Sequence, residues 1–271
     1  MMNNVLTVDL EDMSHSRYEN ASQAKDDIDG PFLDYSTNQL LDVLDRYSAK
    51  ATFFTLGVIA KKMPSLVKRI HDRGHEIASH GFYHKPVYAL TPEDFRHDLV
   101  DSLTALQDAT GQKVYGFRAP YWSVTNRSLW ALDIIGECGL AYDSSISPVM
   151  SFLYGIKGAP RFMYKHSKGF WEIPPTTCAV LGKLVIVGGG FYLRALPYWF
   201  TRQVIRSLNK DRRFGLVYLH PHELVNQRSA DVLSVGEYVI LNFNKGSFRR
   251  KFTGLLGEFT FLPIKKMLDV S

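Results

Sequence analysis

Short apolar segments alternate with amphipathic segments along most of this chain, and the alternation limits the folds that it can adopt. Residues 5–8 and 51–56 are runs rich in valine, phenylalanine and threonine, which is typical of buried strands. Between such runs, apolar residues recur every three or four positions, as at residues 40–47 and 95–106, which indicates helices. Strands that alternate with helices favour an α/β fold with a parallel sheet, either open or closed into a barrel.

Several local signals predict where helices and loops begin and end. Thr91 is followed by proline and two acids, which predicts the start of a helix, and Gly111 predicts its end. Ser36 or Thr37 is a candidate N-cap for the helix at residues 40–47. The polar residues 13–31 predict a long loop, and loops of this length often act as lids or binding loops.

Length and composition indicate one globular domain over residues 1–271. With 45% hydrophobic and 22% charged residues, the chain has ordinary proportions for such a domain. No apolar run approaches ~18 residues, so we expect no stable membrane insertion. The N-terminus shows no secretory signal pattern. Cys138 and Cys178 are the 2 cysteines and do not suggest a disulfide framework, so we expect a cytoplasmic location.

The chain is basic, with a formal net charge of +5 and a pI of about 9.0. The basic clusters are typical of solvated helix faces, and attraction to anionic glycans or to a membrane surface is the functional alternative. We find no nucleic-acid-binding motif and expect no nucleic-acid partner. The sequence does not indicate the oligomeric state.

His80 and His84 follow a strand-like segment and lie four residues apart. If the chain turns helically after Ser79, the two side chains share one face and can hold one divalent metal. The pair alone is equally consistent with two surface histidines. A metal site of this kind also needs a carboxylate, and the N-terminal segment offers Asp9, Glu11 and Asp12.

Polar groups follow four of the predicted strands at the point where each strand ends. They are Asp9, Glu11 and Asp12; His80 and His84; Arg118 and Tyr121; and His220, His222 and Glu223. In α/β barrels the catalytic residues lie at the carboxyl ends of the strands, so these groups would meet at one end of the barrel. The pattern therefore predicts a metal-dependent hydrolase.

These motifs resemble those of the polysaccharide deacetylases of the NodB-homology class. The matching segments occur in the order of that family and are residues 7–11, 79–84, 118–121 and 219–221. The resemblance implies a distorted (β/α)7-type barrel with about seven strands. It also implies an enzyme that removes N-acetyl groups from amino sugars with a divalent metal ion, commonly Zn²⁺. Two histidines and one carboxylate also suit iron, cobalt, nickel or manganese.

The first motif departs from the usual form of the family, in which two adjacent aspartates precede a glycine. Here the acids alternate as Asp9 and Glu11, and side chains two residues apart on a strand point to the same face. We therefore favour Glu11 as the carboxylate ligand beside His80 and His84, with Asp12 as the alternative.

Chemical roles can be assigned from what amide hydrolysis requires. A metal held by two histidines and a carboxylate keeps open positions for water and for the acetyl oxygen. Asp9 can act as the general base, and His220 is the candidate general acid for the leaving amine. The resemblance implies that Arg118 pairs with Asp9 and that the backbone N–H of Tyr121 helps to hold the oxyanion.

Three further residues each have two alternative roles. His222 is either a substrate contact or a solvated surface histidine. Asp143, in the segment 142–145, either contacts sugar or stabilises a turn. Glu172 could orient His220, although pairing with some other nearby base is the simpler interpretation.

The expected substrate is an N-acetylated saccharide of a polysaccharide or of its lipid-linked precursor, as in exopolysaccharide or O-antigen assembly. Two other functions are consistent with parts of the pattern. One is a C–N hydrolase that acts on a small cyclic amide, which would need a closed pocket rather than an open groove. The other is a catalytically degenerate glycan-binding barrel, which the presence of base, ligands and acid together disfavours.

Overall fold

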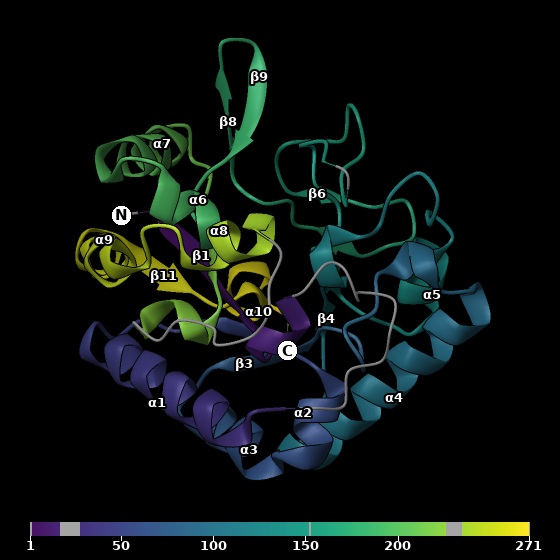
Figure 1. The fold of residues 1–271 in the computed structure, drawn as a ribbon. Coiled ribbons are helices and arrows are strands. Elements are labelled where there is room, and N and C mark those ends of the chain that lie inside the picture. The colour runs from purple at the N-terminus through teal and green to yellow at the C-terminus, as the bar shows by residue number, and fades with distance from the viewer. Residues whose placement is uncertain (1, 17–27, 152, 226–234, 271) are drawn as a thin grey trace.

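The structure is a computed structural model of the chain, and it describes residues 2–16, 28–151, 153–225 and 235–270. Most of the predicted loop over residues 13–31 therefore lies outside the described residues. Figure 1 shows a curled sheet with helices packed around its outer side. A two-stranded hairpin, β8–β9, projects away from this body.

The main sheet is built around the N-terminal strand β1 (Asn3–Leu10). Its strand order is β10-β1-β2-β3-β4-β5-β7-β6, and β11 also pairs with β1. All pairings in this sheet are parallel except the one between β6 and β7. The other strands are β2 (Thr52–Thr55), β3 (Glu76–Ser79), β4 (Gly116–Phe117), β5 (Tyr142–Asp143), β6 (Tyr164–Lys165), β7 (Trp171–Glu172), β10 (Leu216–Leu219) and β11 (Thr260–Leu262).

Helices connect most of the parallel strands. The α-helices are α1 (Gly30–Arg46), α2 (Gly57–Lys62), α3 (Pro64–Asp72), α4 (Pro92–Thr110), α5 (Ala131–Glu137), α6 (Gly190–Ala195), α7 (Tyr198–Lys210), α8 (Val235–Asn242), α9 (Lys245–Glu258) and α10 (Ile264–Leu268). Short 3₁₀ turns occur at η1 (Met13–Ser16), η2 (Val87–Ala89), η3 (Pro120–Trp122) and η4 (Pro221–Leu224). The hairpin consists of β8 (Thr177–Val180) and β9 (Lys183–Ile186).

Alternate residues of β1 face two different environments. Leu6, Val8 and Leu10 pack into the apolar cluster between the sheet and the outer helices. Val5 belongs instead to a second cluster on the inner side of the sheet. Because side chains alternate along a strand, Asp9 continues the inward-facing set of odd-numbered positions. The strand register therefore directs this acid towards the interior of the curled sheet.

The predicted helix over residues 92–110 is confirmed as α4. Thr91 caps it by accepting a hydrogen bond from the backbone N–H of Asp94 at 3.1 Å. Gly111 ends it in the left-handed conformation that glycine adopts readily, with φ of 68°.

The predicted cap for the first helix is wrong. Helix α1 begins at Gly30, and Asp29 accepts a hydrogen bond from the backbone N–H of Phe32 at 3.1 Å. Pro31 stabilises this earlier start because its fixed φ suits the first turn of a helix. Ser36 and Thr37 are instead buried within the helix.

Strands of the main sheet come from both halves of the chain, since β1 pairs with β2 on one side and with β10 on the other. That residues 1–271 form a single domain stays a prediction. In the part of the chain that the structure describes, no helix is long and apolar enough to cross a membrane.

Candidate metal centre and active site

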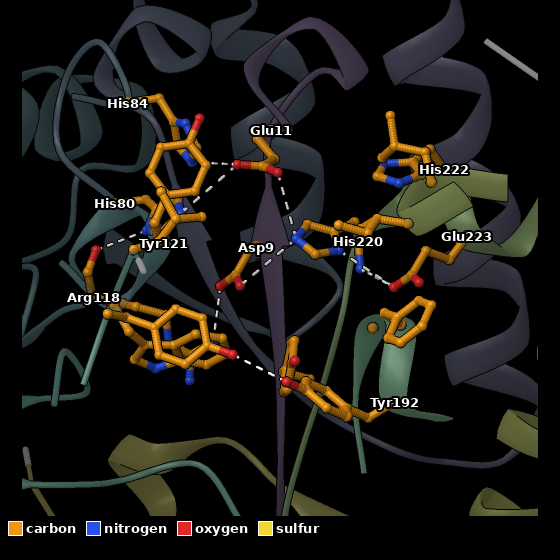
Figure 2. A pocket seen from close by; sticks show the side chains of 18 of the residues that line it. Asp9, Glu11, His80, His84, Arg118, Tyr121, Tyr192, His220, His222 and Glu223 are labelled. Carbon is orange, nitrogen blue, oxygen red and sulfur yellow. Dashed lines mark hydrogen bonds and ion pairs between the residues drawn. The ribbon is translucent and has the colours of Figure 1, made fainter. Parts of the chain in front are cut away.

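A cavity of about 350 Å³ opens at the carboxyl ends of strands β1, β3, β4 and β10. Its lining includes all of the site residues predicted from the sequence: Asp9, Glu11, His80, His84, Arg118, Tyr121 and His220. Figure 2 shows His80 and His84, from the loop after β3, on one side of Glu11, with His220 on the other side. The parallel sheet thus gathers residues that are far apart in the sequence.

Glu11, His80 and His84 form a buried cluster whose candidate ligand atoms all lie within 4.8 Å of one another. The Oε2 atom of Glu11 is 2.5 Å from Nε2 of His84 and 3.9 Å from Nε2 of His80. Asp12 is buried but is not part of this cluster. The geometry therefore favours Glu11 over Asp12 as the carboxylate ligand.

The two histidines do not lie on a helix, so the predicted helical turn after Ser79 is wrong. The chain turns sharply at Gly81, which has φ of 76°, and His84 itself has φ of 59°. The Asp98 carboxylate accepts a hydrogen bond from the backbone N–H of Phe82 at 2.8 Å and holds this loop. A loop fixed from α4, rather than helical periodicity, brings the two imidazoles together.

The donor set fits a divalent metal ion. The Nδ1 atom of His80 lies 2.7 Å from the carbonyl oxygen of Arg118, so an Nδ1–H donor leaves the Nε2 lone pair directed towards Glu11. Burial lowers the pKa of His80 to about 4, which keeps the ring neutral, as a metal ligand must be. Burial raises the pKa of Glu11, but the neighbouring His84 and His220 outweigh it and keep the carboxylate ionised.

Asp9 lies beside this cluster and is held by Arg118. The guanidinium donates hydrogen bonds to Oδ1 of Asp9 at 2.8 Å and to the hydroxyl of Thr7 at 3.0 Å. It also donates to the hydroxyl of Ser144 at 3.0 Å and lies 4.1 Å above the ring of Phe54. Arg118 is 1% exposed, so its position is fixed by packing as well as by charge.

His220 lies on the side of Glu11 opposite His80 and His84 (Figure 2). Its Nε2 atom is 3.4 Å from Oε1 of Glu11 and 4.0 Å from Oδ2 of Asp9. Its Nδ1 atom is 3.3 Å from Oε2 of Glu223, whose other oxygen accepts a hydrogen bond from Nε of Arg194 at 2.9 Å. The imidazole is therefore oriented by a carboxylate that is itself held by an arginine.

This arrangement favours the protonated form of His220. Burial lowers its pKa, but the hydrogen bond to Glu223 and the charge of Glu11 outweigh burial and raise the pKa to about 9. Burial raises the pKa of Glu223, and its contacts with His220 and Arg194 lower it to about 2. The pair is thus arranged as an imidazolium that can donate a proton.

Two further residues of the candidate site, Glu223 and Arg194, line the cavity, and no role was predicted for either from the sequence. His220 caps the 3₁₀ turn η4, and Glu223 lies within this turn, three residues later. The contact between Glu223 and His220 could therefore have been inferred from their spacing. Arg194 comes from α6, and no sequence pattern connects it to this site. Its guanidinium also donates to the carbonyl oxygens of Ile240 at 2.7 Å and Phe243 at 2.8 Å, which ties the end of α8 to the site.

Glu172 does not orient His220, so that interpretation is wrong. Its carboxylate accepts a hydrogen bond from the backbone N–H of Ile146 at 3.0 Å and lies against Asp143. Asp143 is fully buried and contacts the hydroxyl of Ser145, which accepts a hydrogen bond from the backbone N–H of Ala119 at 2.8 Å. The segment 142–145 therefore supports the loop after β4 instead of contacting sugar.

Tyr121 lies in that loop and lines the cavity. Its backbone is left-handed, with φ of 57°, and its hydroxyl donates to the carbonyl oxygen of His15 at 2.5 Å. Its ring packs edge-on against His84 with 4.6 Å between centroids. The role of its backbone N–H in holding an oxyanion stays a prediction.

His222 is buried and lines the cavity, so the surface alternative is wrong. Its ring stacks on His220 with 5.2 Å between centroids, and burial lowers its pKa to about 3. Its Nδ1 atom has no hydrogen-bond partner among the described residues. The rest of the cavity is largely aromatic and aliphatic, with Trp122, Leu153, Tyr154, Phe191, Tyr192, Tyr218, Ile240 and Leu241.

Comparison with known families shows which proteins this chain resembles in sequence and fold. The polysaccharide deacetylase family model matches residues 26–141, and a domain of unknown function, DUF3473, matches residues 144–269. Residues 26–141 thus match the polysaccharide deacetylase family model, and the predicted resemblance is confirmed. The site spans both segments and the strand before them, since Asp9 and Glu11 precede the first match and His220 lies in the second.

One curated relative is a peptidoglycan-N-acetylglucosamine deacetylase of Bacillus cereus, 29% identical over 145 residues. The match covers 49% of this chain and 52% of the relative. The chain spans about half the length of the first curated relatives that it matches.

Solved structures share the fold. A Mycobacterium smegmatis protein named as a polysaccharide deacetylase has a TM-score of 0.58 at 17% identity, covering 98% of this chain and 90% of that one. A pseudoenzyme of the CE4 family from Bacillus anthracis has a TM-score of 0.53 at 15% identity, covering 99% and 66%. The predicted NodB-like distorted α/β barrel is confirmed, with the sheet curled into a partial barrel.

Proposed function

We propose that this protein is a metal-dependent carbohydrate N-deacetylase that removes acetyl groups from an N-acetylated saccharide. One observation carries the proposal. The buried cluster of Glu11, His80 and His84 lies beside two further groups. Asp9 is a carboxylate held by Arg118, and His220 is an imidazole held by Glu223. Amide hydrolysis needs a metal site, a base and an acid around one carbonyl group, and this arrangement supplies candidates for all of them.

The metal ion would be held by Glu11, His80 and His84. When bound, it lowers the pKa of water and polarises the acetyl carbonyl. Zn²⁺ is our first candidate because nitrogen and carboxylate donors suit it, although the same donors also suit other divalent metals.

Asp9 is placed to accept the proton of the attacking water. Arg118 neutralises the charge of Asp9 from the far side and fixes its Oδ1 atom, which leaves Oδ2 to face the cavity. A base that is held in one orientation does not need to reorganise before proton transfer. Arg118 is itself held by its hydrogen bonds to Thr7 and Ser144.

His220 is placed to protonate the leaving amine. Its Nε2 atom faces the same cavity as Asp9, and Glu223 at Nδ1 stabilises the protonated form. After the proton is given up, the ionised Glu223 again favours protonation of the ring. The backbone N–H of Tyr121 is the proposed donor to the oxyanion.

The substrate proposal is an N-acetylated amino sugar in a polysaccharide or in its lipid-linked precursor. The curated relative described above is named for N-acetylglucosamine in peptidoglycan, which supports the sugar class but not the polymer. Aromatic residues on the cavity wall, such as Trp122 and Tyr192, offer faces on which a sugar ring can stack. A cytoplasmic location stays a prediction.

The fold alone does not establish activity, because a CE4 family pseudoenzyme shares it. The direct test measures acetate release from a panel of N-acetylated saccharides, with each divalent metal added back to chelated protein. We expect release with at least one saccharide and its loss in Asp9→Asn. Metal binding without acetate release from any member of the panel would instead favour a degenerate glycan-binding barrel.

A further inference from the structure

The β8–β9 hairpin projects from the body of the protein (Figure 1) and pairs with no other strand of the described chain. At its base Thr177 and Ile186 are buried, whereas its remaining residues are exposed or partly exposed. These residues are mostly apolar, since the strands read TCAV and KLVI. A two-stranded hairpin is marginally stable by itself, and an apolar one that extends into water is more costly still.

Two independent features make the tip of the hairpin energetically unfavourable in water. Leu181 and Gly182 form its two-residue loop, with φ of 48° and 77°. Positive φ at both positions favours Asn-Gly, because a leucine there strains the backbone. The Leu181 side chain is also 99% exposed, and the adjacent Val180 is 38% exposed. Folding of the free protein therefore gains nothing from leucine at this position, and binding to an apolar partner would explain it.

The base of the hairpin carries positive charge. A second cavity, of about 400 Å³, lies there and is lined by Thr176 and Thr177 of the hairpin base and by Arg161, Arg212 and Arg213. Arg161 donates to the carbonyl oxygen of Thr177 at 3.0 Å, and Arg213 lies 3.8 Å above the ring of Phe162. Among the described residues, no aspartate or glutamate lines this cavity.

We propose that the hairpin docks the protein on an anionic phospholipid bilayer, with Leu181 and Val180 in the acyl boundary and the arginines at the level of the lipid phosphates. The dimensions agree. Strands of 4 residues place the tip roughly 13 Å beyond the base at about 3.3 Å per residue. Interfacial segments bury their apolar side chains ~5–10 Å below the headgroups, which this reach allows.

Other occupants fit less well. A second copy of the chain would need roughly 800 Å² of buried surface on each partner, more than the tip of one hairpin offers. A free phosphate would use the arginine cavity but would leave the exposed leucine unexplained. The bilayer accounts for the apolar tip and the cationic base together.

The docking surface is connected to the active site through a short segment. Strand β9 ends at Ile186, and α6 begins shortly after it at Gly190, which lines the active-site cavity together with Phe191. The arginine cavity lies at the amino ends of β1 and β10, at the edge of the sheet opposite the active-site cavity. The docking proposal does not depend on the proposed deacetylase activity, because its test measures binding alone.

The test is co-sedimentation of the full chain with vesicles of phosphatidylcholine alone or of phosphatidylcholine mixed with phosphatidylglycerol. The key variant is Leu181→Asn, which relieves backbone strain while it removes the apolar tip. We expect it to unfold at the same temperature as the wild type or higher, and to bind mixed vesicles at least about tenfold more weakly. The matched control is Leu129→Asn, since Leu129 is 45% exposed but lies before α5, away from the hairpin.

The arginines are tested with an Arg212→Gln, Arg213→Gln double variant. We expect this variant to bind mixed vesicles roughly tenfold or more weakly, and we expect added salt to weaken vesicle binding by the wild type in the same way.

The proposal is overturned if the wild type does not sediment with mixed vesicles, or if Leu181→Asn binds these vesicles as tightly as the wild type. Dissociation of a dimer by Leu181→Asn, without vesicle binding by the wild type, would assign the hairpin to self-association. Binding of inorganic phosphate without vesicle binding would assign the cavity to a free anion.

Discussion

The guanidinium of Arg118 donates a hydrogen bond to Asp9 at 2.8 Å, and both side chains are almost completely buried. The carbonyl oxygen of the same arginine lies 2.7 Å from Nδ1 of His80. One residue therefore aligns the proposed base through its side chain and a proposed metal ligand through its backbone. This coupling means that the base and the metal site share one support, the loop after β4.

The role of Asp9 can be tested with an isosteric change. Asp9→Asn keeps the hydrogen bond to Arg118 but removes the basic oxygen, so turnover should fall by ~10² or more, as expected for loss of a general base. Metal content should stay unchanged because Asp9 is outside the ligand cluster. Asp12→Asn is the matched control and should retain most of its acetate release. The opposite ranking of the two variants would move the base to Asp12.

Metal binding should depend on three residues and not on their neighbours. We expect about one divalent ion per chain in elemental analysis, and its loss in His80→Ala and in Glu11→Gln. His97→Ala is the control, since His97 is an exposed histidine on α4. Asp12→Asn should keep the ion. An equal metal content in the wild type and in a His80→Ala, His84→Ala double variant would show that the proposed site is wrong.

Some of this site could be predicted because it depends on strand periodicity. Asp9 and Glu11 are two residues apart at the end of β1, so alternation alone directs them to one side. His220 follows β10, and parallel strands deliver their carboxyl ends to one edge. In such cases, sequence spacing translates directly into position.

Other parts depend on contacts that sequence spacing does not encode. The helical turn predicted for His80 and His84 did not take Gly81 into account. This glycine adopts a positive φ, which favours a sharp turn over a helix. Arg194 reaches Glu223 across 29 positions from a different helix. The β8–β9 hairpin was not predicted because Leu181 occupies a position where asparagine would have given the usual signal.

The contact between Glu223 and His220 predicts a change in the pH dependence of turnover. His220 must be protonated to act as an acid, so its deprotonation produces the alkaline limb of the pH profile. Glu223 is a main cause of the raised pKa of His220, opposing burial, so Glu223→Gln should move this limb to lower pH. Glu137→Gln, on an exposed residue that pairs with Arg96, is the control. A lower rate with an unmoved alkaline limb would mean that Glu223 stabilises only the fold.

The buried pair Asp143 and Glu172 predicts an unusual contribution to stability. Burial raises the pKa of Asp143 to about 6, and burial with the charge of Asp143 raises the pKa of Glu172 well above its usual range. Because both pKa values are raised by folding, the pair's stabilising contribution is fully present at low pH. It is lost as the pH rises through about 6 and beyond.

An amide in place of one carboxyl group should remove this dependence. In the variant Glu172→Gln, the new side-chain amide would donate an N–H to Asp143 without needing a bound proton. The stability of the variant should therefore increase relative to that of the wild type as the pH rises. We expect the difference in free energy of unfolding to shift towards the variant by on the order of 1 kcal/mol between about pH 5 and about pH 8. Urea unfolding at a series of pH values measures it, with Glu137→Gln as the control that should run parallel to the wild type. Ser145 connects this pair to Ala119 in the loop after β4. If the stability of Glu172→Gln also ran parallel to that of the wild type across the pH range, the pair would support this loop without sharing a proton.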